Sequence, residues 1–209
     1  MAKKRVVVLA SGSGSNFQSI INFAQNGASF EIVGLIVNVP EVKAIERAKT
    51  ANIPSKLVNH KDYATRTDFE TALNQALLDF NAELVVCAGF MRILQAEFVE
   101  KWEGKMINIH PSLLPKYKGL HTHQRAIDAG DKTAGCTVHF VNAGVDEGAI
   151  IGQAEVEIMD GDDADKLASR VIIKEHILYP LCVDAVASGK IILTNGACLN
   201  DGKLEMIKI

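Results

Sequence analysis

An amide and an imidazole lie two positions apart at the end of an apolar run, Asn108 and His110 in the sequence MINIHP at 106–111. In an extended chain the two side chains project from the same face. An amide N–H stabilises a developing oxyanion, and an imidazole that titrates near neutral pH donates or accepts a proton. The pair therefore predicts a site for acyl transfer. The alternative, that both residues only anchor a loop, stays open at this point.

A third candidate is Asp146, in the turn VDEG at 145–148. A carboxylate in such a turn is often only a solvated turn former. If the turn faces the same cleft, Asp146 would raise the pKa of His110 and keep it cationic, or hold a water that relays protons. The chain contains no GxSxG elbow, and no cysteine has an obvious histidine partner in sequence. The three residues therefore favour acyl transfer without a covalent nucleophile.

The glycine-rich loop SGSGSN at 11–16 follows the first apolar run and opens a helix. Free backbone N–H groups there favour an anion, most simply a phosphate. Phe17 stands where a dinucleotide fingerprint needs a glycine, the second strand ends at Asn38 rather than at an acidic residue, and no Gly-Lys-Ser/Thr follows. NAD and P-loop nucleotide sites are therefore disfavoured. A tight turn capped by Ser15 or Asn16 is the alternative.

Metal and disulfide chemistry are not expected. The spacings His121-x-His123 and Cys136-x-x-His139 match no standard zinc site, so we assign no metal. The cysteines are scattered without a Cys-x-x-Cys pair, and none is expected in a disulfide: Cys87, Cys136, Cys182 and Cys198.

The elements that must position these residues follow βαβ order, with strand-length apolar runs alternating with segments of helical period. This predicts an α/β, single-domain Rossmann-like fold with a mostly parallel central sheet, helices on both faces and a mixed C-terminal part. The expected strands are 5–9, 31–37, 56–58, 84–88, one that ends at His110, 135–141 and 149–158, and the expected helices are 16–25, 42–50, 66–80, 96–102, 122–129 and 163–187. Small strands and turns are expected over 191–209.

Composition excludes several classes of protein. The chain has 209 residues, of which 48% are hydrophobic and 22% charged, an ordinary globular balance. Its net charge of −3 argues against a nucleic acid partner. No apolar run approaches the ~20 residues that cross a bilayer, and the basic start at 3–5 precedes too short an apolar run for a signal peptide. We expect a cytoplasmic protein with no membrane partner.

Four segments together resemble the glycinamide ribonucleotide formyltransferases of the purine pathway: SGSGSN at 11–16, AGFMRIL at 88–94, INIHPSLLPKYKGLHTH at 107–123, and the turn that contains Asp146. The resemblance spans nearly the whole chain. The element INIHPSLLP is typical of the broader formyltransferase family that uses 10-formyltetrahydrofolate. The SGxGSN loop points to members whose substrate carries a ribose phosphate.

The resemblance implies that the amine of glycinamide ribonucleotide attacks the formyl carbon of 10-formyltetrahydrofolate, the co-substrate, through a tetrahedral intermediate. It implies that Asn108 hydrogen-bonds the formyl oxygen and that His110, as a cation, stabilises the oxyanion and assists proton transfer. Asp146 would support His110 and relay a proton through water.

The resemblance also implies the binding residues. Glycinamide ribonucleotide would be held by Gly14, Ser15, Asn16 and Glu175. The pterin would be bordered, largely through backbone, by Met91, Arg92, Ile93 and Leu94 and by Asn142, Ala143, Gly144 and Val145, with Arg66 in the folate region. The single domain at 1–209 would then have a phosphate-binding half at about 1–100 and a folate and catalytic half at about 101–209.

Rival functions within and outside the family are disfavoured. Methionyl-tRNA formyltransferases typically add a C-terminal nucleic-acid-binding domain, formyltetrahydrofolate hydrolases usually add an N-terminal regulatory domain, and sugar-nucleotide formyltransferases are not expected to keep this phosphate loop. A non-catalytic small-molecule binding module is disfavoured by the intact set of Asn108, His110 and Asp146. A monomer or a homodimer is expected.

Overall fold

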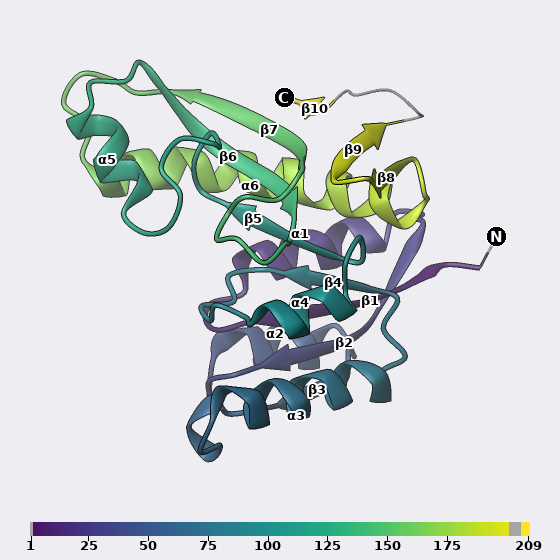
Figure 1. Ribbon diagram of the computed structural model, residues 1–209. Helices are drawn as coiled ribbons and strands as arrows, with labels where there is room; N and C mark the ends of the chain where they lie inside the picture. Colours follow the sequence, from purple (N-terminus) through teal and green to yellow (C-terminus); the bar gives the residue numbers. More distant parts are fainter. Residues whose placement is uncertain (1, 201–205) are drawn as a thin grey trace.

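The computed structural model, which describes residues 2–200 and 206–209, is built on one eight-stranded sheet (Figure 1). The order across the sheet is β10-β7-β6-β5-β4-β1-β2-β3. Its strands are β1 (Lys4–Ala10), β2 (Phe30–Val37), β3 (Ser55–Leu57), β4 (Leu84–Cys87), β5 (Met106–His110), β6 (Thr133–Phe140), β7 (Ile150–Glu157) and β10 (Ile207–Lys208). A separate antiparallel hairpin pairs β8 (Ile191–Thr194) with β9 (Ala197–Asn200).

The sheet is mostly parallel. β1 pairs in parallel with β2 and with β4, β4 with β5, and β2 with β3, whereas β6 is antiparallel to both of its neighbours. From β1 the chain winds outward to β3 and then returns to add β4 and β5 on the other side. The carboxyl ends of β1 and β4 therefore form the switch point at which open α/β sheets bind ligands.

Helices cover both faces of the sheet, as the alternating apolar pattern predicts. In β1 the side chains of Val6 and Val8 belong to one buried cluster with α1 and α6, and those of Val7 and Leu9 belong to another with α3 and α4. Figure 1 shows α6 running behind β6 and β7. The helices are α1 (Ser15–Ala24), α2 (Lys43–Thr50), α3 (Arg66–Asp79), α4 (Ala96–Lys101), α5 (Thr122–Asp128) and α6 (Ala164–Ala187), with a 3-10 turn, η1 (His60–Asp62).

The long helix α6 is tied to the functional edge of the sheet. The Tyr179 hydroxyl is fully buried and donates to the Cys87 carbonyl at 2.8 Å, at the end of β4. A buried tyrosine that finds a hydrogen-bond acceptor contributes its apolar ring to the core without leaving a polar atom unpaired. This contact keeps α6, which carries Glu175, in register with the end of β4.

The expected architecture is confirmed, with small differences. β6 begins at Thr133, two residues before the sequence pattern predicts, and the turn η1 was not predicted. The predicted strands and turns of 191–209 are β8, β9 and β10, and residues 201–205 of that segment lie outside the described residues. All four cysteines are free and buried. Within the described ranges no helix is long and apolar enough to span a membrane.

Candidate active site

The end of β5 places Asn108 and His110 at the rim of the sheet, as their spacing predicts. β6 pairs antiparallel with β5, so that Asn108 faces His139 and His110 faces Thr137 across the ladder. His110 is buried and Asn108 is half-buried. Because neighbouring strands fix both backbones, the two side chains are held on a rigid support.

His110 lies between two hydrogen-bond acceptors. Its Nε2 is 2.9 Å from the Tyr117 carbonyl, and its Nδ1 is 3.2 Å from Asp146 Oδ2. Both oxygens only accept, so the protonated ring donates to both of them, whereas the neutral ring, with a single N–H, donates to only one. The same Asp146 oxygen accepts from the Gly119 N–H at 3.0 Å. The predicted convergence of Asn108, His110 and Asp146 on one place is present in the structure.

The turn that delivers Asp146 depends on its backbone. Asp146 itself has φ 53°, a left-handed conformation that aspartate adopts more readily than most residues. Gly148 passes so close to β6 that an added Cβ would lie 1.6 Å from the Phe140 carbonyl oxygen. Only glycine fits there, and the turn can therefore fold back until the Asp146 carboxylate reaches His110.

His139 is a site residue that the sequence did not reveal. Its Nδ1 is 2.8 Å from the Phe140 carbonyl, and its Nε2 is 3.3 Å from Asn108 Nδ2 and 3.6 Å from Asp146 Oδ1. The sequence offered it only as half of a rejected zinc spacing. The register of β6 against β5, which brings it to Asn108, is not encoded in any local motif.

The ionisation of the cluster differs in one respect from the sequence expectation. Burial lowers the pKa of His110, and the opposing effects of the Tyr117 carbonyl and Asp146 do not fully offset it. Asp146 does raise the pKa of His110, as expected, but by less than burial lowers it. Burial also raises the pKa of Asp146, but His139, the Gly119 N–H and His110 outweigh it and hold that pKa below its usual value.

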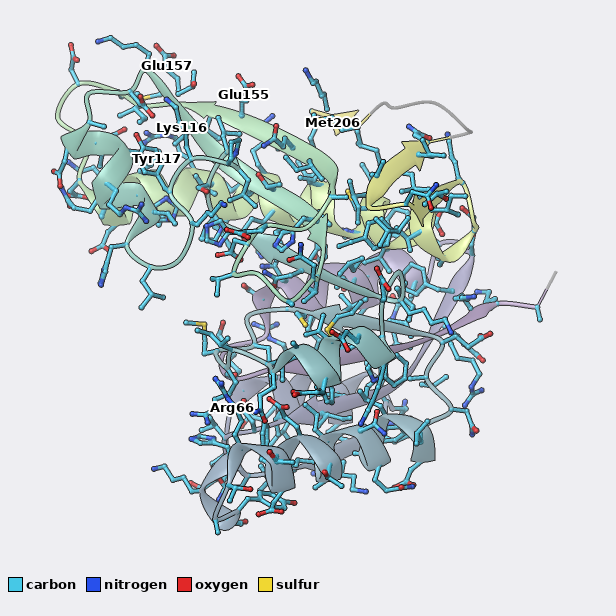
Figure 2. All side chains as sticks on the ribbon, in the orientation of Figure 1. Arg66, Lys116, Tyr117, Glu155, Glu157 and Met206 are labelled. Carbon is cyan, nitrogen blue, oxygen red and sulfur yellow. The ribbon has the colours of Figure 1, made fainter. Side chains whose placement is uncertain are left out.

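The loop between β5 and α5 is fastened at its middle. The Tyr117 hydroxyl donates to Asp131 Oδ2 at 2.7 Å, and Lys116 Nζ is 3.0 Å from the same oxygen. The Arg125 guanidinium lies 5.3 Å from the centre of the Tyr117 ring. Figure 2 shows Lys116 and Tyr117 next to each other on this loop. By holding Lys116 and the Tyr117 ring, Asp131 thus fixes the part of the loop whose Tyr117 carbonyl contacts His110.

The glycine-rich loop leads into α1 through a left-handed glycine. Gly14 has φ 67° and caps α1, and a Cβ there would lie 2.9 Å from Ala44 Cβ on α2. The loop can approach α2 this closely only because residue 14 is glycine. Gly14 and Ser15 therefore lie at the amino end of a ten-residue helix.

Asn16 and Glu175 meet across the molecule. Asn16 Nδ2 donates to Glu175 Oε2 at 2.6 Å, and both side chains are buried. Burial raises the pKa of Glu175, and the hydrogen bond from Asn16 opposes the shift. Asn16 Oδ1 is buried with no hydrogen-bond partner among the described residues. Buried acceptors are rarely left unpaired, so this oxygen suits a hydroxyl or amine of a ligand.

The expected folate segment at 91–94 follows β4 and is tied to the glycine-rich loop. Ser11 Oγ accepts from the Met91 N–H at 2.7 Å and donates to Asn38 Oδ1 at 2.6 Å. Met91 and Ile93 are 68% and 61% exposed, an unusual degree for apolar side chains at the switch point. Arg92 and Leu94 are half-buried. These side chains can cover an aromatic ring system.

The other expected folate residues border this segment to different degrees. Leu94 packs against the same buried cluster as Val141, which immediately precedes Asn142. Asn142 Oδ1 accepts from the Gly144 N–H at 3.2 Å, and Ala143 and Val145 are exposed. The two segments thus flank one region of the surface, next to Asp146.

Arg66, the first residue of α3, reaches the end of the 91–94 segment indirectly. Its Nε lies 3.9 Å from Glu70 Oε1, and the same oxygen accepts from the Gln95 N–H at 2.9 Å. Figure 2 shows Arg66 well separated from Tyr117. Arg66 is therefore at the outer end of the expected folate region rather than beside His110.

Similarity to known proteins extends across almost the whole chain. The model of the formyl transferase family matches residues 4–183, a range that contains every site residue expected from the sequence. The phosphoribosylglycinamide formyltransferase of Haemophilus influenzae is 40% identical over 201 residues, which cover 96% of this chain and 95% of that protein. The trifunctional purine biosynthetic protein adenosine-3 of Chironomus tentans is 48% identical over 196 residues. That alignment covers 92% of this chain, which spans only 14% of the trifunctional protein.

Solved structures of such formyltransferases are similar to this chain in fold as well. The phosphoribosylglycinamide formyltransferase of Coxiella burnetii, determined in complex with CHES, matches with a TM-score of 0.95 and 40% identity over 99% of both chains. Glycinamide ribonucleotide transformylase 1 of Symbiobacterium toebii matches with a TM-score of 0.91 and 36% identity, over 94% of this chain and 93% of that one. The similarity in sequence and the similarity in fold therefore both extend over almost the whole chain.

Proposed function

This chain belongs to the formyl transferase family, and from that membership and the geometry of the site we propose that it transfers the formyl group of 10-formyltetrahydrofolate to glycinamide ribonucleotide. The products are formylglycinamide ribonucleotide and tetrahydrofolate, in purine biosynthesis. The observation that carries the proposal is the convergence of Asn108, His110 and Asp146 at the end of β5.

The reaction needs one bond made, one bond broken and one proton moved. The amine nitrogen bonds to the formyl carbon, the bond from that carbon to folate N10 breaks, and a proton passes from the amine nitrogen to N10. The intermediate is tetrahedral and carries an oxyanion. An enzyme for this reaction must therefore stabilise the oxyanion and relay the proton.

The side chains at the end of β5 suit these two tasks. One N–H of the Asn108 amide points to His139, which leaves its second N–H to donate to the oxyanion. Because the pKa of His110 is lowered in the free protein, its ring can accept the amine proton. The resulting cation donates to Asp146 and Tyr117 and is further stabilised by the oxyanion. Asp146 stabilises that cation and provides the other end of a proton path through water.

The substrates would lie on either side of this centre. The loop of Gly14 and Ser15 offers backbone N–H groups to the phosphate, and the pair of Asn16 and Glu175 offers acceptors to ribose hydroxyls or the glycinamide amine. The pterin would lie between the segments at 91–94 and 142–145. Both substrates are then bound next to Asp146 at the same time, as a direct transfer requires.

We also propose a cytoplasmic location and action as a monomer or homodimer without nucleic acid. Four buried free thiols suit a reducing compartment, and a net charge of −3 offers no general attraction to a phosphate backbone.

The experiment measures tetrahydrofolate release from 10-formyltetrahydrofolate with and without glycinamide ribonucleotide. We expect release only when the amine is present. Release without it would make the protein a hydrolase, and no release despite folate binding would exclude the enzyme. His110→Ala should lower kcat by about two or more orders of magnitude, with smaller effects on KM, because it removes charge stabilisation made in the transition state. A change in KM alone would contradict that role.

A further inference from the structure

An open cavity of about 520 Å³ lies between α1 and α6 and reaches the glycine-rich loop at Ser15. Its lining also includes Gln18, Arg47 and His176. Of the described residues that line the cavity, none is acidic, and Arg47 and His176 are the titratable ones. A recess that gathers a permanent cation, an imidazole and a helix amino terminus without any carboxylate has the charge pattern of an anion site.

Arg47 comes from α2 and is fixed against the glycine-rich loop. Its Nε donates to the Ser13 carbonyl at 2.9 Å, and its Nη1 donates to Gln18 Oε1 at 3.0 Å. The second terminal nitrogen, Nη2, has no hydrogen-bond partner in the part of the chain that the structure describes. No described carboxylate forms an ion pair with Arg47 either. The guanidinium is thus held in place by neutral groups while part of its donor capacity remains unused.

His176 supplies a second unused polar atom in the same recess. Its Nε2 is buried and has no hydrogen-bond partner among the described residues. Burial lowers the pKa of His176, and repulsion from the charge of Arg47 lowers it further. An anion between them would remove that repulsion and give the buried nitrogen a partner.

Lys174, the other basic residue in this part of α6, does not line the cavity. One turn before Glu175 stands Ile172, and Ile173 follows it with an exposed apolar side chain. A dianionic phosphate bound by backbone N–H groups alone would keep most of its charge uncompensated, and charge-assisted hydrogen bonds are about twice as strong as neutral ones. Arg47 is the side chain whose position and charge meet this need.

We propose that Arg47, with His176 beside it, binds the phosphate of the ribonucleotide substrate and makes the enzyme selective for the phosphorylated amine over the corresponding nucleoside. This inference rests on the proposed function, since that function supplies the phosphate. Arg47 belongs to α2, so the phosphate subsite is formed by three separate parts of the chain: the glycine-rich loop, α2 and α6.

The test compares two substrates in four proteins. We measure kcat/KM for glycinamide ribonucleotide and for its dephosphorylated nucleoside with the wild type, Arg47→Gln, Arg47→Lys and Lys49→Gln. Lys49 is an exposed cation on the same helix that does not line the cavity, so its substitution removes the same charge as a matched control. Arg47→Gln should lower kcat/KM for the ribonucleotide by about 10- to 100-fold, the range for one charge-assisted contact, and change that for the nucleoside by about twofold at most. Arg47→Lys should retain more activity than Arg47→Gln.

Three results of this comparison would overturn the inference. An equal loss with both substrates would mean that Arg47 only supports the loop through Ser13 and Gln18, and no loss with either would mean that it does not bind substrate. If Lys49→Gln lowers kcat/KM for the ribonucleotide as much as Arg47→Gln does, the loss comes from general surface charge and not from a contact with the phosphate.

A binding measurement separates this inference from the proposed function. Ribose 5-phosphate is titrated into each protein and followed by the amide resonances of Ser15 and Asn16. If the wild type binds it and Arg47→Gln weakens binding about tenfold or more, the phosphate site stands even if formyl transfer is absent. If formyl transfer occurs but both proteins bind ribose 5-phosphate equally, the inference fails and the function stands.

Discussion

His139 Nε2 lies 3.3 Å from Asn108 Nδ2, directly opposite it in the pairing of β5 with β6. The other ring nitrogen lies 2.8 Å from the Phe140 carbonyl, so that in the tautomer with the proton on Nδ1 the lone pair of Nε2 accepts from the Asn108 amide. His139 therefore fixes which way the amide points. The N–H that remains is the one available to the formyl oxygen.

Replacing His139 should impair the chemical step more than substrate binding. In His139→Leu the Asn108 amide loses its partner and can rotate, so we expect kcat to fall about 10- to 100-fold, the scale of a small misplacement of a catalytic group. KM for both substrates should change little. His139→Gln, whose side-chain carbonyl can accept from Asn108, should retain more activity. If both variants lose the same activity, the role assigned to the lone pair is wrong.

The ionisation of His110 is open to direct measurement. Because burial lowers its pKa, the ring should lose its proton at a pH below the ordinary value of about 6.5. Asp146 raises the pKa of His110, so Asp146→Asn should move the midpoint to still lower pH. The measurement follows the His110 ring resonances by NMR across a pH series, without substrates. A midpoint above the ordinary value, or an upward shift in Asp146→Asn, would contradict the electrostatic balance described for the site.

The parts of the site that the sequence predicts share a physical basis. The alternation of a strand places Asn108 and His110 on one face, and a glycine loop before a helix exposes N–H groups, so both follow from local geometry. Helices and strands were equally predictable, because apolar periodicity is a local property. In each case a few neighbouring residues contain all the information that is needed.

The parts that the sequence misses depend on register and on distance along the chain. His139 reaches Asn108 only through the pairing of two antiparallel strands, and Arg47 reaches the glycine-rich loop from the next helix. The direction of the net pKa shift of His110 is not evident from the sequence either, since it depends on how deeply the ring is buried as well as on Asp146. Burial depth and contacts between distant segments are consequences of the whole fold and leave no motif.

The contact of Asp131 with Tyr117 should control how well His110 is held. Asp131→Asn removes the charge that binds Lys116 and weakens the acceptor of the Tyr117 hydroxyl, so the loop should open more often and the Tyr117 carbonyl should leave His110. We expect faster proteolysis within 112–121 and a kcat lowered by about tenfold.

Asp128→Asn is the matched control for Asp131→Asn. Asp128 is an exposed carboxylate at the end of α5 that accepts from Gln124 Nε2. Its substitution removes the same charge from the same region without touching the loop, and it should leave both proteolysis and kcat unchanged. If the two variants behave alike, Asp131 acts only through surface charge.

Gly14 and Gly12 stand in the same loop but should respond very differently to substitution by alanine. At Gly14 an added Cβ meets a left-handed backbone with φ 67° and lies 2.9 Å from Ala44 Cβ, which is itself buried on α2. Backbone strain and the clash should together lower the free energy of unfolding by about 1–3 kcal/mol. At Gly12 a Cβ would meet nothing within 4 Å. Gly12→Ala should therefore change stability by about 0.5 kcal/mol or less, as surface substitutions usually do.

The two alanine variants also separate stability from binding. In Gly14→Ala the loop must move away from α2 to make room, which should draw the Ser13 carbonyl away from Arg47 and weaken binding of the ribonucleotide phosphate. Urea denaturation measures the first effect, and the KM for glycinamide ribonucleotide at a temperature where both variants are folded measures the second. A Gly14→Ala protein that matches Gly12→Ala in both would show that the close approach of the loop to α2 is needed neither for folding nor for phosphate binding.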